Sequence, residues 1–392
     1  MKILSVNAGS SSLKFQMYEM PDEEVLISGV FERIGMEESF YTIKLNGEKY
    51  EKKVELNDHK KAFELLVSEL MANNIVDTLD DISGIGHRIV QGGSYFDRSV
   101  IASEEVIQKI DELSSLAPLH NPAAITGIRA AQAVVPNAVQ TVVFDTAFHQ
   151  SIPEENYLYA LPYEWEKDYK IRRYGAHGTS HKYVSLKMNE ILDRTDTKLI
   201  TCHIGNGASI SAVLNGKCLN TSMGLTPNAG LIMGTRCGDI DATILPYIME
   251  KLNISPKEMD NIMNKQSGLL GVSGVSSDSR DIEEGIKEGN KRCELAQKMY
   301  VRRIVDYIAK YYVELGGCDG IVFTAGVGEN SVPVRRQVMK ELEVLGIYLD
   351  EEKNNIRGSL QRISTNESKV PVYVIPTDEE VMIARDTFAL AK

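Results

Sequence analysis

The sequence predicts an α/β protein with two domains. At 392 residues the chain is longer than one ordinary hydrophobic core supports, so two cores are expected. Predicted strands alternate with predicted helices, which is typical of sheets covered by helices. A weak internal repeat suggests two related halves, because residues 3–15 and 199–211 each read as strand, tight Gly-containing turn and strand. The repeat alone is equally compatible with two unrelated β-hairpins.

The first half is predicted to begin with strands and continue with helices. Asn46-Gly47 predicts a hairpin over 41–56, because Asn-Gly is favoured in two-residue turns. Asp58 is a predicted N-cap for a helix that continues to Asn73. The other elements expected here are strands over 82–89 and 139–145 and helices over 103–115 and 122–135.

The second half shows the same kinds of element. A hairpin is predicted at Asn215-Gly216, and Asp378 is the predicted cap of a final helix. The boundary between the halves is expected near residue 150, around Pro153. The other expected elements are helices over 241–252, 255–265, 291–315 and 333–345 and strands over 321–324 and 370–375.

Composition excludes several functional classes. The net charge of −12 argues against binding to a nucleic-acid backbone, which requires a basic surface. The five cysteines include no C-x-x-C pair, so neither a disulfide framework nor a paired-cysteine zinc site is expected. No segment resembles a signal peptide or a membrane span, which predicts a cytoplasmic protein without a membrane partner.

Three glycine-containing turns are candidate phosphate sites. Residues 7–14 form a strand, a Gly/Ser turn and Lys14, a pattern that suits phosphate or Mg²⁺-bound water, although no Walker A sequence is present. Residues 204–207 repeat this turn. Residues 324–331 follow an apolar strand and open a helix, which favours nucleotide contact. Ser331 replaces the third glycine of a dinucleotide fingerprint, so a dehydrogenase is disfavoured. Plain hairpin turns and helix packing are the simpler alternatives.

Charged and imidazole side chains near glycines are candidate catalytic groups. Arg88 and Arg236 could hold carboxylate and phosphoryl oxygens, or could form surface ion pairs. His177 and His181 have metal-pair spacing without the Glu of H-E-x-x-H, so donation to a developing negative charge fits better. Asp145 follows an apolar strand, where ligands bind in open α/β sheets, although a loop cap is the alternative.

Taken together, these motifs resemble those of the acetate kinase family across essentially the whole chain. The matching segments are, in order, Asn7–Lys14, Ala117–Pro122, Phe144–His149, His177–His181, Met233–Arg236, Phe323–Ser331 and Pro376–Glu380. The resemblance implies a duplicated ribonuclease-H-like fold, as in actin, Hsp70 and sugar kinases, with two domains around a central cleft that binds ATP. It implies a first domain of 1–149 plus 379–392, to which the C-terminal helix returns, and a nucleotide-binding second domain of 150–378.

The implied activity is reversible phosphoryl transfer between ATP and acetate, which gives acetyl phosphate and ADP by direct in-line attack. The implied cofactors are ATP or ADP and Mg²⁺, with Mn²⁺ as a substitute, and the family acts as a homodimer. A carboxylate is already a nucleophile at neutral pH, so the difficulty is to bring two anions together. A metal ion, guanidinium groups and an imidazole can offset that repulsion.

The resemblance also implies roles for individual residues. Arg88 is implied to bind the substrate carboxylate and Asp145 to lie near the metal, and His177 and Arg236 to stabilise the transferring phosphoryl group. The implied Mg²⁺-site residues are Asn7 and Glu379. The implied nucleotide contacts are Lys14, His203, Gly205, Asn206, Gly207, Asp278, Ser279, Arg280, Gly326, Val327, Gly328, Glu329 and Asn330. The implied acyl pocket consists of Val90, Leu119, Ala176 and Pro227.

Two residues depart from the family pattern. Ala176 stands where the family usually has Phe, which predicts a larger acyl pocket and better use of propionate or butyrate. Gln91 stands where the family usually has His, and the sequence offers no account of it. The alternatives are therefore a propionate or butyrate kinase of the same family, or a non-catalytic actin-like or Hsp70-like ATP-binding module. The chain ends 13 residues after Glu379, which argues against a chaperone's peptide-binding domain.

Overall fold

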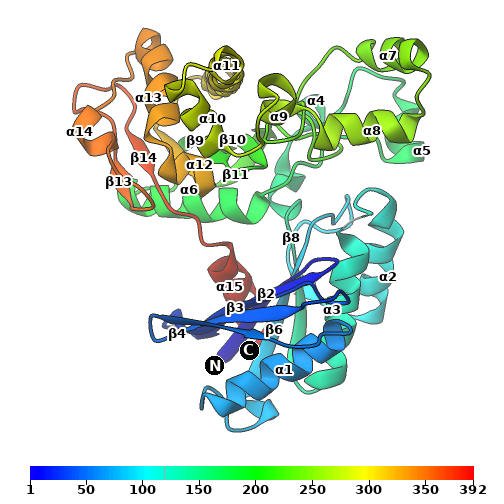
Figure 1. Cartoon of the computed structure of the whole chain (residues 1–392). Coiled ribbons are helices and arrows are strands. Elements are labelled where there is room, and N and C mark those ends of the chain that lie inside the picture. The colour runs from blue at the N-terminus through cyan, green and yellow to red at the C-terminus, as the bar shows by residue number, and fades with distance from the viewer. Residues whose placement is uncertain (119) are drawn as a thin grey trace. The chain divides into compact units, whose positions relative to one another are not determined.

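The computed structural model describes residues 1–118 and 120–392 (Figure 1). The chain forms two compact units, each with a mixed sheet of its own. Unit 1 comprises Met1–Gln150 and Asp378–Lys392, and unit 2 comprises Ser151–Thr377. Both termini of the chain therefore lie in unit 1.

The sheet of unit 1 has the strand order β5-β4-β3-β2-β1-β6-β8-β7. The strands are β1 (Lys2–Ala8), β2 (Ser12–Glu19), β3 (Glu24–Glu32), β4 (Phe40–Leu45), β5 (Glu48–Lys53), β6 (Ile82–Ile89), β7 (Val100–Ile101) and β8 (Val139–Phe144). Strands β1 to β5 form an antiparallel meander. β6 and β8 add parallel to β1, so their carboxyl ends lie at one edge of the sheet.

Helices cover both faces of this sheet. They are α1 (His59–Ala72), α2 (Glu104–Glu112), α3 (Asn121–Val134) and α15 (Glu379–Ala391). α1 and α3 pack over the apolar core beneath β1 and β2, which includes Leu4, Val6 and Phe63. α15 packs against β6, β1 and β8. Gly84 and Gly86 of β6 allow this close approach, because a Cβ at either position would collide with α15 side chains.

The sheet of unit 2 has the strand order β11-β10-β9-β12-β14-β13. Its strands are β9 (Lys198–Ile204), β10 (Ala208–Leu214), β11 (Lys217–Thr221), β12 (Gly320–Thr324), β13 (Gln361–Arg362) and β14 (Val372–Val374). Its helices are α4 (Glu154–Tyr157), α5 (Glu164–Tyr169), α6 (Gly178–Leu192), α7 (Ile244–Leu252), α8 (Pro256–Lys265), α9 (Gly268–Ser273), α10 (Ser279–Lys287), α11 (Lys291–Glu314), α12 (Ala325–Asn330), α13 (Val332–Glu341) and α14 (Glu351–Asn354). The long helix α11 buries an apolar face in the core of this unit.

The two sheets share one topology, which confirms the predicted duplication. In unit 1 the antiparallel strands β3-β2-β1 continue into the parallel strands β6 and β8. In unit 2 the antiparallel strands β11-β10-β9 continue into the parallel strands β12 and β14 in the same order. The turns after β1 and β9, which contain the glycines of the sequence repeat, therefore occupy equivalent positions.

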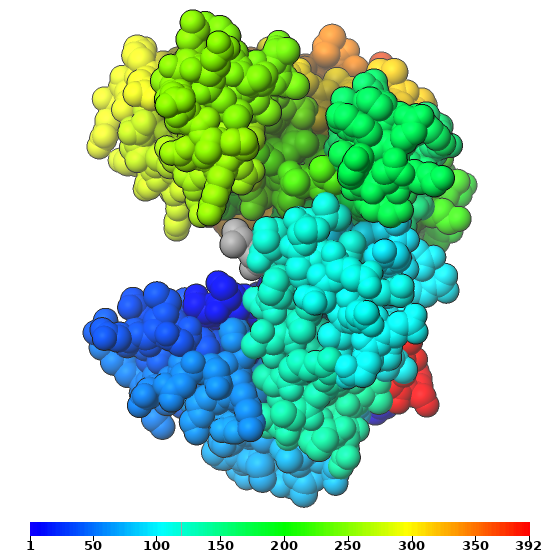
Figure 2. Space-filling model, turned by 90° about the vertical axis from the view of Figure 1, so that its right-hand side faces the viewer, coloured from blue at the N-terminus to red at the C-terminus, as the bar shows by residue number. Residues whose placement is uncertain are grey.

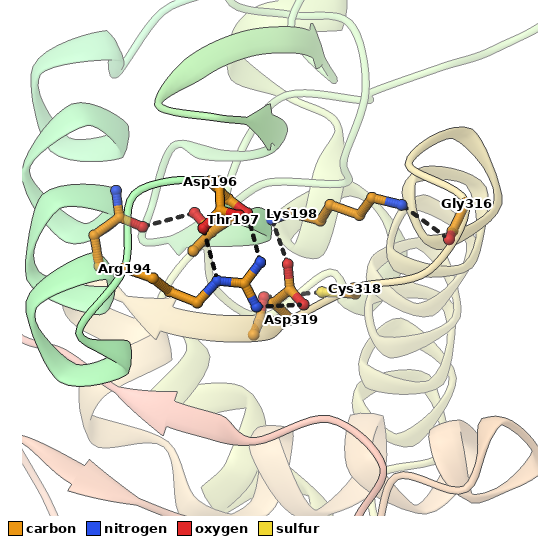
Figure 3. Close-up of polar contacts among 9 residues, drawn as sticks. Arg194, Asp196, Thr197, Lys198, Gly316, Cys318 and Asp319 are labelled. Carbon is orange, nitrogen blue, oxygen red and sulfur yellow. Dashed lines mark hydrogen bonds and ion pairs between the residues drawn. The ribbon is translucent and has the colours of Figure 1, made fainter.

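A polar cluster fixes the amino ends of the parallel strands in unit 2 (Figure 3). The amide of Lys198 donates to Oδ2 of Asp319 at 2.8 Å, which joins the start of β9 to the start of β12. Arg194 forms ion pairs with Asp196 at 3.0 Å and with Asp319 at 3.6 Å. Because β9 and β12 are parallel, this cluster also sets the register of their carboxyl ends, where the candidate site residues lie.

The bounds of most predicted elements are confirmed within one to three residues. The start of α7 differs from the prediction because of local hydrogen bonds. The sequence predicts a helix from Asp241, whereas the helix begins at Ile244. The side chain of Asp241 accepts from the amide and the hydroxyl of Thr243, so it closes a local turn in place of the first helical turn. The strand expected over 370–375 is also shorter, because it spans Val372–Val374.

Candidate active site

Arg88 and Asp145 form the centre of the polar site in unit 1. They lie at the carboxyl ends of the adjacent parallel strands β6 and β8. Nε and Nη2 of Arg88 donate to the two carboxylate oxygens of Asp145 at 3.0 and 2.6 Å. Asp145 is fully buried, and its charge raises the pKa of Arg88. A guanidinium has five N–H groups, so this pairing leaves further donors of Arg88 for an anionic ligand.

A small cavity of about 50 Å³ adjoins this pair. It is lined by Ser5, Asn7, Lys14, Arg88, Glu379, Glu380 and Ile383. Glu379 is the first residue of α15, and burial raises the pKa of its carboxyl to about 7, with Asp145 and Glu380 adding to the rise and Arg88 opposing it. Among the described residues, Oε1 of Glu379 and Oγ of Ser5 are buried without a hydrogen-bond partner.

These two oxygens indicate that the cavity suits a hydrated divalent cation. Buried polar atoms are normally paired, so two unpaired oxygens at one cavity are suited to act as ligands of an ion. The oxygen atoms that could coordinate a metal here belong to carboxylate, amide and hydroxyl groups, which are the ligands that Mg²⁺ prefers. Across residues 1–118 and 120–392, no group of three or more His, Cys, Asp and Glu side chains could hold a metal. Mg²⁺ needs no such group, because it keeps several waters and uses substrate phosphates as ligands.

Lys14, which is predicted to contact nucleotide phosphates, lies beside the start of α15. Its ammonium group forms an ion pair with Glu380, the second residue of α15. The lysine is therefore held by the same helix terminus that carries Glu379. Its ammonium has other N–H donors, so the predicted phosphate contact remains a prediction.

In unit 2, His177 lies at the start of α6 with its backbone in the left-handed region, at φ 58°. This conformation is unfavourable for a residue with a side chain and persists where the surrounding structure requires it. Nδ1 of His177 lies 2.9 Å from Oγ of Ser209, and its ring stacks on that of His203 with centroids 4.0 Å apart. Nδ1 of His203 lies 2.8 Å from Oγ of Ser180. The structure thus brings His177 and His203 together in one cluster.

Arg236 lies next to the same cluster. A Cβ at Gly207 would lie 3.5 Å from Nη1 of Arg236 and 3.7 Å from Nε2 of His177. The guanidinium and the imidazole therefore converge on Gly207, in the turn after β9. Nη1 of Arg236 donates to the carbonyl of Pro227 at 3.2 Å, and burial lowers the pKa of this arginine.

Unit 2 also contains a cavity of about 610 Å³, large enough for a nucleotide. Eight of the predicted nucleotide contacts line it: Gly205, Asn206, Asp278, Ser279, Arg280, Gly326, Val327 and Asn330. They come from the turn after β9, the start of α10 and helix α12. The rest of the lining was not among the predicted nucleotide contacts, although Gly234 and Ser331 lie within motifs noted in the sequence: Gly234, Leu269, Ser277, Glu283, Tyr300, Ser331 and Arg357.

The other predicted nucleotide residues of unit 2 lie outside this lining. His203 and Gly207 belong to the histidine cluster described above. Gly328 is buried within α12. Oε1 of Glu329 accepts from the amides of Ala325 and Thr377 at 2.7 and 3.1 Å, so this carboxylate joins the β12–α12 turn to the segment after β14.

The predicted acyl-pocket residues have different settings. Val90 directly follows β6 in unit 1 and is partly exposed, whereas Leu119 lies outside the described residues. Ala176 is buried within the core of unit 2, and the carbonyl of Pro227 accepts from Arg236.

Gln91, which the sequence left unexplained, has a clear structural role. Its Oε1 accepts from the amide of Gly93 at 2.9 Å and so closes the turn after β6. Asn121 of α3 accepts from the amide of Gln91 and donates to its carbonyl. Gln91 therefore stabilises the loop next to Arg88.

Comparison with known proteins identifies the family. Residues 2–385 match the sequence model of the Acetokinase family.

The chain belongs to the Acetokinase family.

Relatives in this family match over their whole length. Acetate kinase of Bacillus velezensis is 54% identical over 393 residues, and that of Treponema denticola is 52% identical over 404 residues, with 100% of each chain covered. The crystal structure of acetate kinase from Porphyromonas gingivalis has a TM-score of 0.95 and 46% identity, and covers 100% of both chains. A propionate kinase from Francisella tularensis has a TM-score of 0.94 and 42% identity, and covers 99% of both chains. The duplicated ribonuclease-H-like fold that the family resemblance implied is therefore confirmed.

Proposed function

We propose that this protein is an acetate kinase. It transfers the terminal phosphoryl group of ATP to acetate, and the reverse reaction forms ATP from acetyl phosphate and ADP. The observation that carries this proposal is the full-length match to acetate kinases at 52–54% identity. The clusters around Arg88 in unit 1 and around His177 in unit 2 support it, because both contain donors suited to anionic oxygens.

In unit 1, Arg88 is assigned to the substrate carboxylate. Asp145 orients this guanidinium through two hydrogen bonds and leaves its remaining N–H groups for acetate. Asn7 and Glu379 are assigned to a Mg²⁺ ion, with Mn²⁺ as a substitute, and the unpaired oxygen of Glu379 supports this. When bound, the ion neutralises charge on the nucleotide phosphates.

In unit 2, His177 and Arg236 are assigned to the transferring phosphoryl group. An acetate oxygen attacks the terminal phosphorus while the bond to the ADP oxygen breaks on the opposite side. Donors fixed in advance stabilise charge on the phosphoryl oxygens without reorganising, and each such donor is worth roughly 3 kcal/mol in comparable anion sites. ATP or ADP is assigned to the 610 Å³ cavity.

The working form is proposed to be a cytoplasmic homodimer. Helix α7 supports this, because none of its residues is buried although it carries Ile244, Tyr247 and Leu252. Figure 1 shows α7 and α8 at the end of unit 2 away from its sheet, and Figure 2, which views the molecule from that side, shows these helices at the surface. An apolar helix face of this kind is a typical subunit contact. Across the described residues, no helix has the length and apolarity to cross a bilayer.

A propionate or butyrate kinase is the second candidate, favoured by Ala176. This residue stands where the family usually has Phe and is buried in unit 2. A smaller side chain leaves more room for a longer acyl chain, and each added methylene gains about 0.8 kcal/mol when buried. We therefore expect propionate and butyrate to be used comparatively well.

The proposal is tested by an acyl-substrate panel with ATP and Mg²⁺, in which acyl phosphate is trapped as the hydroxamate. We expect acyl phosphate from acetate and also from propionate. The Ala176→Phe variant should lower kcat/KM for propionate and butyrate more than for acetate. Failure of wild-type protein to form any acyl phosphate would contradict the proposed function and favour a non-catalytic ATP-binding module. Inert butyrate together with strong acetate turnover would contradict only the relaxed selectivity.

A further inference from the structure

A chain of hydrogen-bonded side chains runs from the core of unit 2 to His177. Ser209 Oγ lies 2.9 Å from Nδ1 of His177 and 2.8 Å from Nε2 of His181. Nδ1 of His181 lies 2.7 Å from Oγ1 of Thr201. Thr201, His181 and Ser209 are completely buried, whereas His177 is partly exposed. These hydrogen bonds therefore connect the buried interior of unit 2 to the partly exposed imidazole of His177.

Because few hydrogens are shared among these side chains, the proton positions on the His177 and His181 rings depend on each other. A serine hydroxyl has a single hydrogen, so Ser209 can donate to His177 or to His181 but not to both. When Ser209 donates to Nδ1 of His177, the proton of the neutral His177 ring is at Nε2. His181 then donates from Nε2 to Ser209, and Thr201 donates to Nδ1 of His181. This arrangement satisfies every link of the buried chain.

The outward nitrogen of His177 faces the proposed phosphoryl position. A Cβ at Gly207 would lie 3.7 Å from Nε2 of His177 and 3.5 Å from Nη1 of Arg236. Phosphoryl oxygens accept hydrogen bonds, so only a protonated Nε2 can bind one. The arrangement in which Ser209 donates to His177 is the one that supplies this proton to a neutral ring.

A second set of contacts limits the tilt of the His177 ring. This ring stacks on that of His203 with an interplanar angle of 18°. Nδ1 of His203 lies 2.8 Å from Oγ of Ser180, which lies 2.8 Å from Oγ1 of Thr377. The His177 ring is thus held at one edge by Ser209 and on one face by His203.

We propose that Ser209 and His181 are positioning residues that fix the tautomer and orientation of His177, so that its Nε2–H faces the transferring phosphoryl group. This inference rests on the proposed function. It assigns roles to two buried residues of strand β10 and helix α6 that touch no substrate. They act through His177, as the partners behind a metal-bound histidine act through their ligand.

Ser209→Ala tests this inference because it removes the oxygen that lies within hydrogen-bond distance of both rings. We expect kcat to fall by about 10- to 100-fold, the loss typical of such supporting partners, with little change in KM for ATP. Ser209→Thr keeps a hydroxyl and should recover most of kcat. In wild-type protein saturated with acetate and a non-hydrolysable ATP analogue, ¹⁵N NMR should show Nδ1 of His177 unprotonated and Nε2 protonated.

Ser211→Ala is the matched control. Ser211 lies two residues further along β10, so it shares a face with Ser209, and it is also completely buried. Its Oγ lies 2.9 Å from Oγ1 of Thr221 and so provides a hydroxyl of the same kind that holds no histidine. Its loss should lower thermal stability without lowering kcat.

Equal kcat values for the two alanine variants would overturn the inference. If Ser209→Ala does not fold, the wild-type NMR spectrum decides, because protonated Nδ1 with unprotonated Nε2 would equally overturn it. The tautomer is measured without turnover. A wild-type protein with the expected tautomer but without kinase activity would therefore contradict the proposed function and leave the positioning chain supported.

Discussion

Gly207 is the residue on which Arg236 and His177 converge. A methyl group there would meet both side chains at ordinary contact distances, the shorter being 3.5 Å to Nη1 of Arg236. Gly207 does not have a positive φ, so its backbone conformation accepts alanine. An alanine there therefore causes no positive-φ strain, but its methyl group fills the space beside the two side chains.

We expect Gly207→Ala to fold normally and to lose about 100-fold in kcat, because the methyl group displaces the phosphoryl group from its donors. Steady-state kinetics and thermal unfolding, measured on the same preparation, check this. An unchanged melting temperature with near wild-type kcat would mean that the phosphoryl group lies elsewhere.

Arg88 shows how far sequence reasoning reaches at a single residue. The sequence left two interpretations open, a ligand-binding arginine and an ion pair. The structure shows the ion pair, with Asp145, and this pairing uses only part of the guanidinium, so ligand binding by Arg88 stays a prediction. Glycine-rich motifs marked Asn7 and Arg88. Ser5 and Ser209 could not be found from the sequence, because a serine within a strand carries no signal until its neighbours in space are known.

At the scale of elements, helix α15 packs closely on strand β6 because the glycines of β6 have no Cβ. A Cβ at Gly86 would lie 2.5 Å from Cγ2 of Ile383 and would also collide with Thr387. Such overlap forces α15 away from the sheet. Because Glu379 is the first residue of α15, a displacement of this helix also moves the proposed metal ligand.

We expect Gly86→Ala to destabilise the protein by about 1–3 kcal/mol, the usual cost of overpacking, and to weaken Mg²⁺ binding. Denaturant unfolding and isothermal titration with Mg²⁺ and ADP measure the two effects. Gly326→Ala is the control for stability, because a Cβ there would meet no atom within 4 Å. Equal unfolding free energies for the two variants would contradict the packing argument.

Helices that begin with a clear N-cap residue could be predicted from the sequence, whereas helices without one could not. Asp58 and Ser103 accept from helix amides as expected, so α1 and α2 were placed correctly. Helix α6 was missed because its cap is His177, whose side chain makes no capping hydrogen bond. The short helices α4 and α5 bury no residues, so they lack the apolar spacing by which helices are recognised.

At the scale of the whole molecule, the exposed side of α7 bears on assembly. Tyr247 and Leu252 are 61% and 60% exposed, so charge at these positions should not disturb the fold. We expect the wild-type protein to sediment as a dimer and Tyr247→Glu with Leu252→Glu to sediment as a monomer. Val344→Glu, at an exposed apolar residue outside α7, is the control. A dimer that survives both changes would exclude α7 from the interface.

The duplication was visible in the sequence only at two short segments, yet it extends through both sheets. Residues 3–15 and 199–211 aligned because the turns after β1 and β9 need glycine and small polar residues. The remaining strands are related only by their order, which depends on pairing between distant segments. Such pairing leaves little trace in a single sequence, because many side chains fit a buried strand equally well.

Unit 1 is built from both ends of the chain, and this sets an order of events during synthesis. Unit 2 is continuous in sequence and can fold as soon as Thr377 has left the ribosome. Unit 1 must hold β1, β6 and β8 without their covering helix until the last residues are translated. Because Glu379 arrives with that helix, a chain interrupted before it would carry the nucleotide cavity of unit 2 but would lack one of the two proposed metal ligands. If Glu379 has the proposed role, unfinished copies of the chain are inactive until the last helix is added.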